Sequence, residues 1–364
     1  MKPRKTTKVD PLELLEAVRD LTPLDKTVTI MEVCGTHTMA IGKSGMRQLL
    51  PPNLKLVSGP GCPVCVTHEA EVETFLHLAQ HENVILATFG DLMRVPGQSS
   101  SLAQARAQGA RVIVVYSTLE ALKLARLYPD REVVFLGVGF ETTAPTVAMS
   151  IMQASKERIA NYSVYSMHKL VPPAIEALLS QGEVKIDGFL CPGHVSTIIG
   201  TKPYEPAAQK YNKPCVITGF DIEDILQALI MLLTQIKERR CEVQNQYVRG
   251  VNSQGNMSAL GVLQEVFEVA DAFWRGFGTI YASGLKLRER YQEYDALSRF
   301  EVPHFDFGKS VNACSCGDIL KGKMIPPECR LYKRACTPAK PRGPCMVSSE
   351  GACAAYYRFE EFGG

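Results

Sequence analysis

The feature that most constrains the fold is a succession of eight short β-rich runs separated by helical stretches. The runs recur at intervals of about 20 to 30 residues, which is typical of β–α–β units, because a parallel strand pair needs a crossover long enough to hold a helix. The pattern therefore predicts an α/β protein built on parallel sheets. The predicted strands cover residues 28–33, 54–57, 84–87, 112–116, 133–136, 162–166, 188–190 and 216–218.

Eight parallel strands are compatible with one closed barrel or with two open sheets, and their spacing does not distinguish the two arrangements. We favour two sheets of about four strands each. The first α/β domain would cover residues 25–128 and the second residues 129–221, with the joint near Tyr128-Pro129-Asp130.

Residues 1–24 are predicted to hold an N-terminal helix. Asp10 is a suitable N-cap, and Pro11 occupies the first helical position, where a missing N–H costs nothing. We expect this amphipathic helix to pack on the C-terminal domain. Its apolar residues recur at helical spacing and are Leu14, Leu15, Val18 and Leu21.

The C-terminal domain, residues 222–364, is predicted to begin as a mainly helical segment and to end as a cysteine-rich one. Apolar runs over 225–236 and 260–273 predict two helices before about residue 300. Beyond Phe300, six cysteines fall within 40 residues of low apolar periodicity, and such a segment needs a staple because it cannot build a core unaided. These are Cys314, Cys316, Cys329, Cys336, Cys345 and Cys353.

Composition and charge exclude several classes of protein. A formal net charge of +2 gives no reason to expect nucleic acid or an anionic membrane surface as a partner. No apolar run reaches the roughly 18 residues of a membrane span, and the start Met1-Lys2-Pro3-Arg4-Lys5 lacks the apolar segment of a signal peptide. We therefore expect a cytoplasmic protein, in which twelve cysteines indicate metal binding or redox chemistry.

Polar and sulfur-bearing side chains collect directly after the predicted strands. In parallel α/β sheets the carboxyl ends of the strands are where ligands bind. Two domains that face each other by those edges would bring these side chains into one cleft. The candidate site residues are Cys34, His37, Cys62, Cys65, Glu141 and His194.

The clearest of these motifs is the turn Gly59-Pro60-Gly61-Cys62-Pro63-Val64-Cys65, which ends a strand and presents two thiols. The helix-like run over 69–76 follows, and its positive end would lower the thiol pKa values. Such a pair can bind a metal or cycle through a disulfide. A structural zinc half-site is the alternative interpretation.

The other candidates each have a structural alternative. A cysteine after a strand is more often a core residue, but His37 three residues after Cys34 favours a thiol that is activated or ligates a metal. Glu141 precedes a helix that begins near Pro145, where any carboxylate is favourable. His194 is as compatible with a buried core histidine as with a site residue.

The C-terminal cysteines suit either zinc or an iron–sulfur cluster, because both are bound by sets of thiolates. Zinc sites usually use tight Cys-x-x-Cys pairs, and the intervals between Cys329, Cys336, Cys345 and Cys353 are longer. We therefore favour a 4Fe–4S cluster, which accepts ligands from spread positions.

Five motifs in this order resemble the HypD family of NiFe-hydrogenase maturation proteins, over a stretch from about residue 25 to the end. The motifs are Met31-Glu32-Val33-Cys34-Gly35-Thr36-His37-Thr38, Gly59-Pro60-Gly61-Cys62-Pro63-Val64-Cys65, Gly139-Phe140-Glu141-Thr142-Thr143-Ala144-Pro145-Thr146, Cys191-Pro192-Gly193-His194, and Gly343-Pro344-Cys345-Met346-Val347-Ser348-Ser349-Glu350-Gly351-Ala352-Cys353.

The resemblance implies two Rossmann-like domains plus a third that holds a 4Fe–4S cluster. It also implies a scaffold on which iron carrying two cyanides and one carbon monoxide, Fe(CN)2CO, is assembled, rather than a conventional turnover enzyme. The implied partners are a small chaperone, HypC, which contributes an amino-terminal cysteine, and the cyanide-donating pair HypE and HypF.

Carried onto this chain, the resemblance makes Cys34 the ligand of the assembling iron, with His37 nearby, and Cys62 and Cys65 a dithiol/disulfide pair. Glu141 and His194 would line the cleft. The implied cluster ligands are Cys329, Cys336, Cys345 and Cys353, with Cys314 or Cys316 as an alternative ligand.

These assignments suggest a hypothesis in which electrons pass from the cluster to the Cys62/Cys65 pair and then to iron at Cys34. Two rival functions are a stand-alone thiol-disulfide reductase and an adaptor whose metal only staples the tail. The Cys34-Gly35-Thr36-His37 motif argues against both, since neither needs a third thiol with an imidazole.

Overall fold

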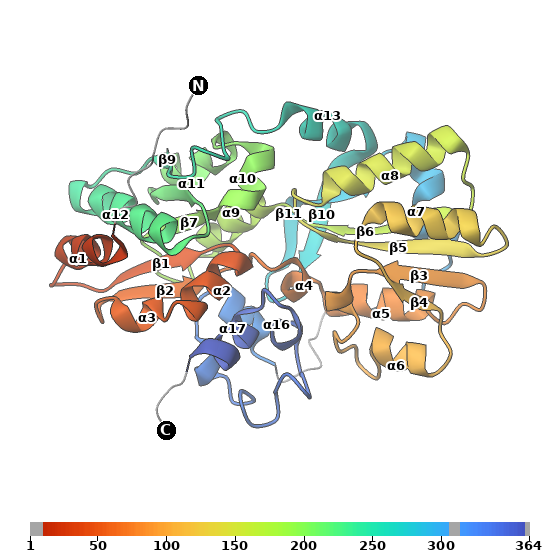
Figure 1. Ribbon diagram of the computed structural model, residues 1–364, viewed down its shortest axis with the longest axis horizontal. Helices are drawn as coiled ribbons and strands as arrows, with labels where there is room; N and C mark the ends of the chain where they lie inside the picture. Colours follow the sequence, from red (N-terminus) through yellow and green to blue (C-terminus); the bar gives the residue numbers. More distant parts are fainter. Residues whose placement is uncertain (1–9, 306–313, 361–364) are drawn as a thin grey trace.

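The computed structural model describes residues 10–305 and 314–360, and it contains two parallel sheets that lie end to end (Figure 1). All eight predicted strands are present, so the α/β class and the parallel sheets are confirmed. Sheet A has the order β2-β1-β7-β8-β9, and sheet B has the order β4-β3-β5-β6. Sheet A consists of β1 (Val28–Glu32), β2 (Leu54–Ser58), β7 (Gly188–Pro192), β8 (Cys215–Thr218) and β9 (Val243–Asn245); sheet B consists of β3 (Val84–Thr88), β4 (Val112–Val114), β5 (Glu132–Gly139) and β6 (Tyr162–His168).

The two sheets do not follow the predicted division into residues 25–128 and 129–221. Sheet A begins with β1 and β2, but β7, β8 and β9 complete it after all of sheet B has been formed. Tyr128-Pro129-Asp130 lies just before β5, inside sheet B. The reason is the pairing of β1 with β7, in register Ile30 to Gly188. This pairing joins strands far apart in sequence, and strand spacing carries no information about it.

Helices cover both faces of each sheet. On sheet A, α2 (Gly35–Lys43) and α12 (Ile222–Glu238) cover one face, and α9 (Val171–Gln181) and α11 (Glu205–Gln209) cover the other. On sheet B, α7 (Thr118–Leu127) and α8 (Ala144–Glu157) cover one face, and α5 (Glu69–Leu78) and α6 (Leu102–Ala107) cover the other. Each sheet is therefore the centre of a three-layer sandwich.

The N-terminal helix α1 (Pro11–Leu21) forms as the sequence predicts, with the Asp10 carboxylate accepting a hydrogen bond from Leu12 N at 2.9 Å. Its apolar side packs on α12, which lies within the segment 222–364. However, α12 belongs to the layer that covers sheet A, and the cysteine-rich part of that segment is separate from it (Figure 1). Helix α1 thus extends the core of sheet A.

The predicted helix over 260–273 is partly wrong, and so is the expectation of a mainly helical segment up to residue 300. Helix α13 (Met257–Val266) ends early, and β10 (Phe267–Trp274) and β11 (Gly278–Leu287) then form an antiparallel hairpin. Gly276 and Gly278, with φ angles of +82° and +77°, form its turn. A short apolar run does not distinguish helix from strand, and here pairing with β11 decides in favour of a strand.

The cysteine-rich C-terminal lobe, residues 314–360, packs beneath sheet A (Figure 1). Its helices are α15 (Cys316–Leu320), α16 (Pro344–Val347) and α17 (Ala352–Phe359). The Arg47 guanidinium fastens the lobe by contacting Glu32 at the end of β1 and Glu360 after α17, each at 2.5 Å. The shorter elements are α3 (Met46–Leu49), α4 (Pro63–Val66), η1 (Gly90–Leu92), α10 (Gly193–Ile199), η2 (Lys202–Tyr204), η3 (Glu289–Tyr294), α14 (Ala296–Arg299) and η4 (Pro326–Glu328).

Within residues 10–305 and 314–360, no helix is both long enough and apolar enough to cross a membrane.

The loops that follow β1 and β2 touch backbone to backbone. Gly35 N donates to Gly61 O at 3.1 Å, and Gly59 N donates to Glu32 O at 2.8 Å. A Cβ added at Gly61 would lie 1.2 Å from Val33 O, so the close approach requires glycine. This contact places the loop after β1 directly against the Cys-x-x-Cys turn.

Replacing Gly61 with alanine should therefore force the two loops apart and lower the free energy of unfolding by about 3 kcal/mol or more. Gly261→Ala is the matched control, because Gly261 is exposed within α13 and an added Cβ meets nothing within 4 Å. Alanine should stabilise that helix by about 0.5–1 kcal/mol. Thermal unfolding of both variants tests the difference in sign, and a Gly61→Ala melting temperature equal to that of wild type would contradict it.

Candidate functional site

A pocket of about 250 Å³ lies where the carboxyl ends of the two sheets face each other. Sheet A contributes the loops after β1, β2 and β7, and sheet B contributes the segments after β3, β5 and β6. Loops from both sheets thus line one pocket, but of the six candidate residues only Cys34 and His194 are part of its lining. The pocket is mostly apolar, and its lining includes Val33, Cys34, Gly61, Pro63, Val64, Phe89, Asp91, Val138, Phe140, Thr142, Thr143, Val171, His194 and Glu350.

Cys34 lies in the wall of this pocket, as the N-cap residue of α2, and only 7% of its surface is exposed. Burial, followed by the charge of Glu350, raises the pKa of its thiol to about 11, although hydrogen bonds from Thr36 and His37 act in the opposite direction. The thiol is thus protonated at neutral pH until something displaces the proton. A soft metal ion is the kind of ligand that does so.

Cys62 and Cys65 form a disulfide, with an S–S distance of 2.06 Å. Cys62 also caps α4, because its sulfur accepts a hydrogen bond from Cys65 N at 3.1 Å. Both residues are buried and do not line the pocket themselves, but Gly61, Pro63 and Val64 do. The disulfide therefore lies directly behind residues that line the pocket, and Cys34 is part of the same lining.

His37 is turned away from the pocket, and His194 faces it. The His37 ring is fully buried and donates from Nε2 to Gly219 O at 3.0 Å, and burial lowers its pKa to about 4. The Phe220 ring lies between the two imidazoles, with centroid distances of 4.8 Å to His37 and 3.9 Å to His194. The neutral His37 thus holds Phe220, and Phe220 holds the exposed His194 at the pocket.

Glu141 lies behind the wall of the pocket, although the resemblance places it in the cleft lining. One carboxylate oxygen accepts from Val171 N at 3.0 Å, and the other has no hydrogen-bond partner among the described residues. Burial raises the pKa of this carboxyl to about 7. Its neighbours Phe140 and Thr142 form the wall itself.

Residues 348–350, here called the strap, cross from the C-terminal lobe to both sheets. One carboxylate oxygen of Asp91 accepts from Ser348 Oγ at 3.1 Å, Ser349 N at 3.2 Å and Ser349 Oγ at 3.0 Å. Glu350 accepts from Thr36 Oγ at 2.8 Å and lines the pocket near Cys34. The strap thereby closes the pocket from the side of the lobe.

The sequence analysis did not select three residues that help to form the site. They are Glu350, Asp91 and Phe220. Asp91 and Phe220 each follow a strand, a signal that could have selected them. Glu350 lies in the last cysteine motif, but nothing in that motif shows that it reaches α2. Its contact with Thr36 joins residues 314 positions apart.

The sulfur atoms of the C-terminal lobe lie close together. The Cys316 thiol is within hydrogen-bonding reach of Cys314 and Cys345, and Cys345 is within reach of Cys353. Cys336 lies near enough to Cys353 and Cys329 for their charges to raise its pKa, after the larger effect of burial. Over residues 10–305 and 314–360, no group of three or more His, Cys, Asp or Glu side chains is arranged to hold a single metal ion.

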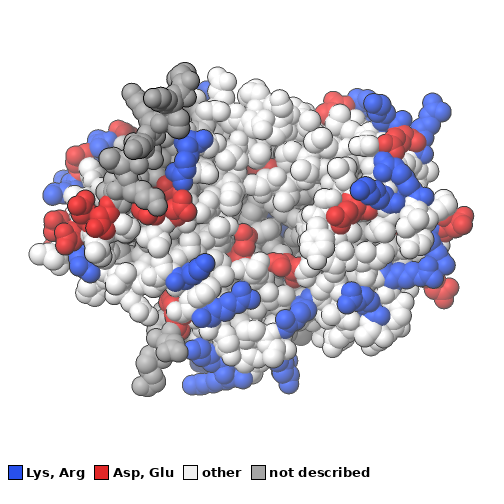
Figure 2. All heavy atoms as spheres, viewed as in Figure 1, with Lys and Arg blue, Asp and Glu red and all other residues white. Residues whose placement is uncertain are grey.

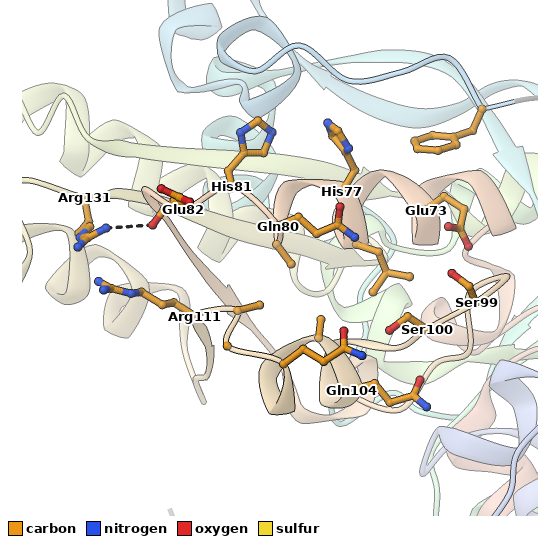
Figure 3. Close-up of a pocket in the computed structure, with 17 residues that line it drawn as sticks. Glu73, His77, Gln80, His81, Glu82, Ser99, Ser100, Gln104, Arg111 and Arg131 are labelled. Carbon is orange, nitrogen blue, oxygen red and sulfur yellow. Dashed lines mark hydrogen bonds between the residues drawn. The ribbon is translucent and has the colours of Figure 1, made fainter.

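A larger, wide-open pocket of about 960 Å³ lies at the opposite edge of sheet B (Figure 3). Glu82, Arg111 and Arg131 border it, and each directly precedes or lies just before a strand. It therefore sits at the amino ends of the strands, the edge where parallel sheets do not bind ligands. Figure 3 shows Arg131 donating to the carbonyl of Glu82, at 2.9 Å, so part of its rim is structural.

Comparison with known proteins gives a consistent answer. A family model described as "HypD: Hydrogenase formation hypA family" matches residues 11–360. The hydrogenase maturation factor HypD2 of Bradyrhizobium diazoefficiens is 46% identical over 359 residues, which cover 96% of this chain and 94% of the relative. The hydrogenase maturation factor HypD of Rhodobacter capsulatus is 46% identical over 339 residues, covering 92% and 90%. A putative hydrogenase expression/formation protein of Methanocaldococcus jannaschii is 42% identical over 336 residues, covering 92% and 93%.

The buried carboxyl of Glu141 should make stability fall as pH rises. Its folded pKa of about 7 lies above the ordinary glutamate value of 4.5, so the folded state holds the proton more tightly than the unfolded chain does. The stabilisation is complete below about pH 4.5 and is lost up to about pH 7, by at most roughly 3 kcal/mol. Glu141→Gln should remove this loss, and the difference in melting temperature between the variant and wild type should widen across that range. A constant difference would contradict the assignment.

Proposed function

The chain belongs to the HypD family of hydrogenase maturation factors, and from that premise we propose that it is the scaffold on which the Fe(CN)2CO group of the hydrogenase is assembled. Cys34 is the ligand that this chain offers to the iron, which is the cargo of the reaction. The supporting observation is the position of Cys34 in a pocket between the carboxyl ends of two parallel sheets.

The size and polarity of the pocket suit this cargo. A volume of about 250 Å³ admits a small metal complex but no large cofactor. Apolar side chains form most of the wall and favour the neutral carbon monoxide ligand. Thr142, Thr143 and His194 line the same pocket and carry groups able to donate hydrogen bonds to cyanide nitrogens.

Binding iron at Cys34 requires the thiol to lose its proton, because only the thiolate is a good metal ligand. With a pKa of about 11 the thiol does not ionise readily by itself. The His194 imidazole faces the pocket and is an acceptor for this proton, since partial desolvation at the pocket lowers its pKa and leaves it neutral at physiological pH. The Phe220 ring beneath keeps that imidazole in place.

The Cys62–Cys65 disulfide is the redox group nearest to Cys34 in our proposal. Its reduction consumes two electrons and two protons and yields two thiols. The two cysteine residues are 2% and 0% exposed, so a large external disulfide cannot reach their sulfurs. This burial disfavours the alternative function, a stand-alone thiol-disulfide reductase, and favours reduction from within the protein.

The C-terminal lobe would hold the source of those electrons. Five of its six thiols are buried and several lie close together, and such a set of thiolate donors suits a 4Fe–4S cluster. Cys329, Cys336, Cys345 and Cys353 are the proposed ligands, and the contact of Cys345 with Cys316 keeps Cys316 as the alternative. Such a cluster, when bound, supplies single electrons at low potential.

The proposed partners follow from the same function. A HypC-type chaperone would supply a second thiolate to the iron from its amino-terminal cysteine. The HypE and HypF pair would supply cyanide. With its apolar wall and a single accessible thiol, the pocket of this chain contains neither of these groups, so the partners must bring them to its mouth.

Infrared absorption tests the scaffold directly. The protein, purified without oxygen together with its small chaperone, should show cyanide and carbonyl stretching bands, and Cys34→Ala should abolish them because the iron loses its ligand. Cys241→Ala is the matched control, since Cys241 is a free, partly exposed thiol outside the pocket lining. Bands that persist in Cys34→Ala would refute the assignment of this ligand.

Cys62→Ser should separate the disulfide from the cluster. Visible absorption of the cluster should remain at the wild-type level, because Cys62 lies outside the C-terminal lobe. The cyanide-bearing iron should fail to form, because a single thiol cannot cycle through the disulfide. An unchanged infrared spectrum in this variant would remove the disulfide from the proposed mechanism.

A further inference from the structure

The C-terminal lobe contains a stretch of unusual charge. Residues 329–349 include five basic side chains and no aspartate or glutamate. All five are exposed, and all lie in the segment 330–342, here called the basic loop. They are Arg330, Lys333, Arg334, Lys340 and Arg342.

The charges of the basic loop are not neutralised within the described part of the chain. None of the five forms an ion pair with a described acidic residue, whereas exposed basic residues elsewhere do, as Arg126 does with Glu157 and Arg240 with Glu238. Figure 2 shows Lys and Arg side chains gathered over the lower lobe of this face. Because the net charge of the whole chain is only +2, the remainder is net acidic, and the basic loop is a local feature.

The basic loop is held in a defined shape. Arg94, from the loop after η1, donates a hydrogen bond to Pro338 O, and Arg342 Nε donates to Ala335 O at 3.3 Å. The Lys333 ammonium lies 6.0 Å from the Tyr332 ring centroid and 5.8 Å from that of Tyr357. A surface held by these contacts presents its charges in a constant arrangement, as a docking site requires.

The same loop covers buried thiols. Cys329 immediately precedes it and Cys336 lies inside it, with exposures of 8% and 6%. Arg342 N donates to the Cys336 sulfur at 3.3 Å, so the backbone that carries the basic side chains also contacts a candidate cluster ligand. A molecule seated on the basic loop would thus be separated from these sulfurs by one layer of chain.

We propose that the basic loop is the docking surface for a small acidic electron-carrier protein that delivers one electron per encounter. The inference rests on the proposed function, which needs electrons in the C-terminal lobe. Two encounters oxidise two carriers by one electron each, and with two protons they account for reduction of the Cys62–Cys65 disulfide to two thiols. Opposite charges on the carrier would steer its encounter to the face that covers the sulfurs.

An acidic protein fits the basic loop better than nucleic acid does. Tyr332, the aromatic residue within the loop, is buried and offers no exposed platform for base stacking. The net acidic remainder of the chain would also repel a long polyanion that extends beyond the loop.

The test compares two charge-reversed pairs in the full-length, cluster-containing protein. Arg334→Glu/Lys340→Glu alters the basic loop at two side chains that form no hydrogen bond or ion pair with residues 10–305 or 314–360. The control Lys123→Glu/Lys237→Glu makes the same change of net charge on α7 and α12. The probe is a reduced, plant-type 2Fe–2S ferredoxin immobilised on a sensor. The measured quantity is its association rate constant with each protein.

At about 10 mM salt the loop variant should associate about tenfold more slowly than wild type, and the control should stay within about twofold. At about 1 M salt the difference should vanish, because the charges are then screened. Equal rates for the two variants, or a defect that persists at high salt, would overturn the proposal. The proposal would also be overturned if the loop variant lost only its binding to a short DNA duplex, used as a second probe, and still bound the ferredoxin as wild type does. The infrared bands of the iron cargo are measured in a separate experiment. If the bands are present but the docking test fails, only the docking proposal is refuted and the scaffold function is still supported.

Discussion

The hydrogen-bonded contact between the loops after β1 and β2 is the constraint on which the site depends. Gly35 N and Gly61 O are 3.1 Å apart, and glycine at position 61 is the only residue type that lets Val33 O approach so closely. This contact places Cys34, which lines the pocket, next to the turn that holds the buried Cys62–Cys65 disulfide. Both sulfur groups are then positioned by backbone geometry, which does not depend on side-chain rotamers.

The chain path explains why the pocket wall faces a second sheet. Sheet B is inserted between β2 and β7 of sheet A, so the chain leaves the Cys-x-x-Cys turn, builds all of sheet B and returns. The hairpin of β10 and β11 then fastens the two parts: Leu170 N, after β6, donates to Ser283 O, and Arg275 N donates to Val66 O. Carboxyl ends from both sheets thus meet at one pocket, and a parallel sheet alone would offer only half of it.

Much of this arrangement could be predicted from sequence, because local patterns determine it. Strand positions and the N-cap at Asp10 follow from periodicity and side-chain chemistry within a few residues. What the sequence did not predict depends mainly on partners outside the local pattern. The pairing of β1 with β7 and the contact of Glu350 with Thr36 join residues far apart in sequence. Residues 267–273 form a strand because they pair with the next strand, β11, which their own apolar pattern does not reveal. His37 and Glu141 were correctly placed after strands, but only the structure shows that both are turned behind the pocket wall.

The strap has a consequence for the order in which the molecule acquires its function. All but one of the residues that line the pocket, Glu350, lie before position 200, yet the wall closes only when residues 348–350 reach Asp91 and Thr36. During synthesis from the amino terminus, those residues emerge after all the strands of both sheets. A nascent chain therefore presents Cys34 at an open edge, and the enclosed pocket exists only after the cysteine-rich lobe has folded onto α2. Completion of the lobe acts as a checkpoint, since a chain truncated before it has both sheets but no closed site.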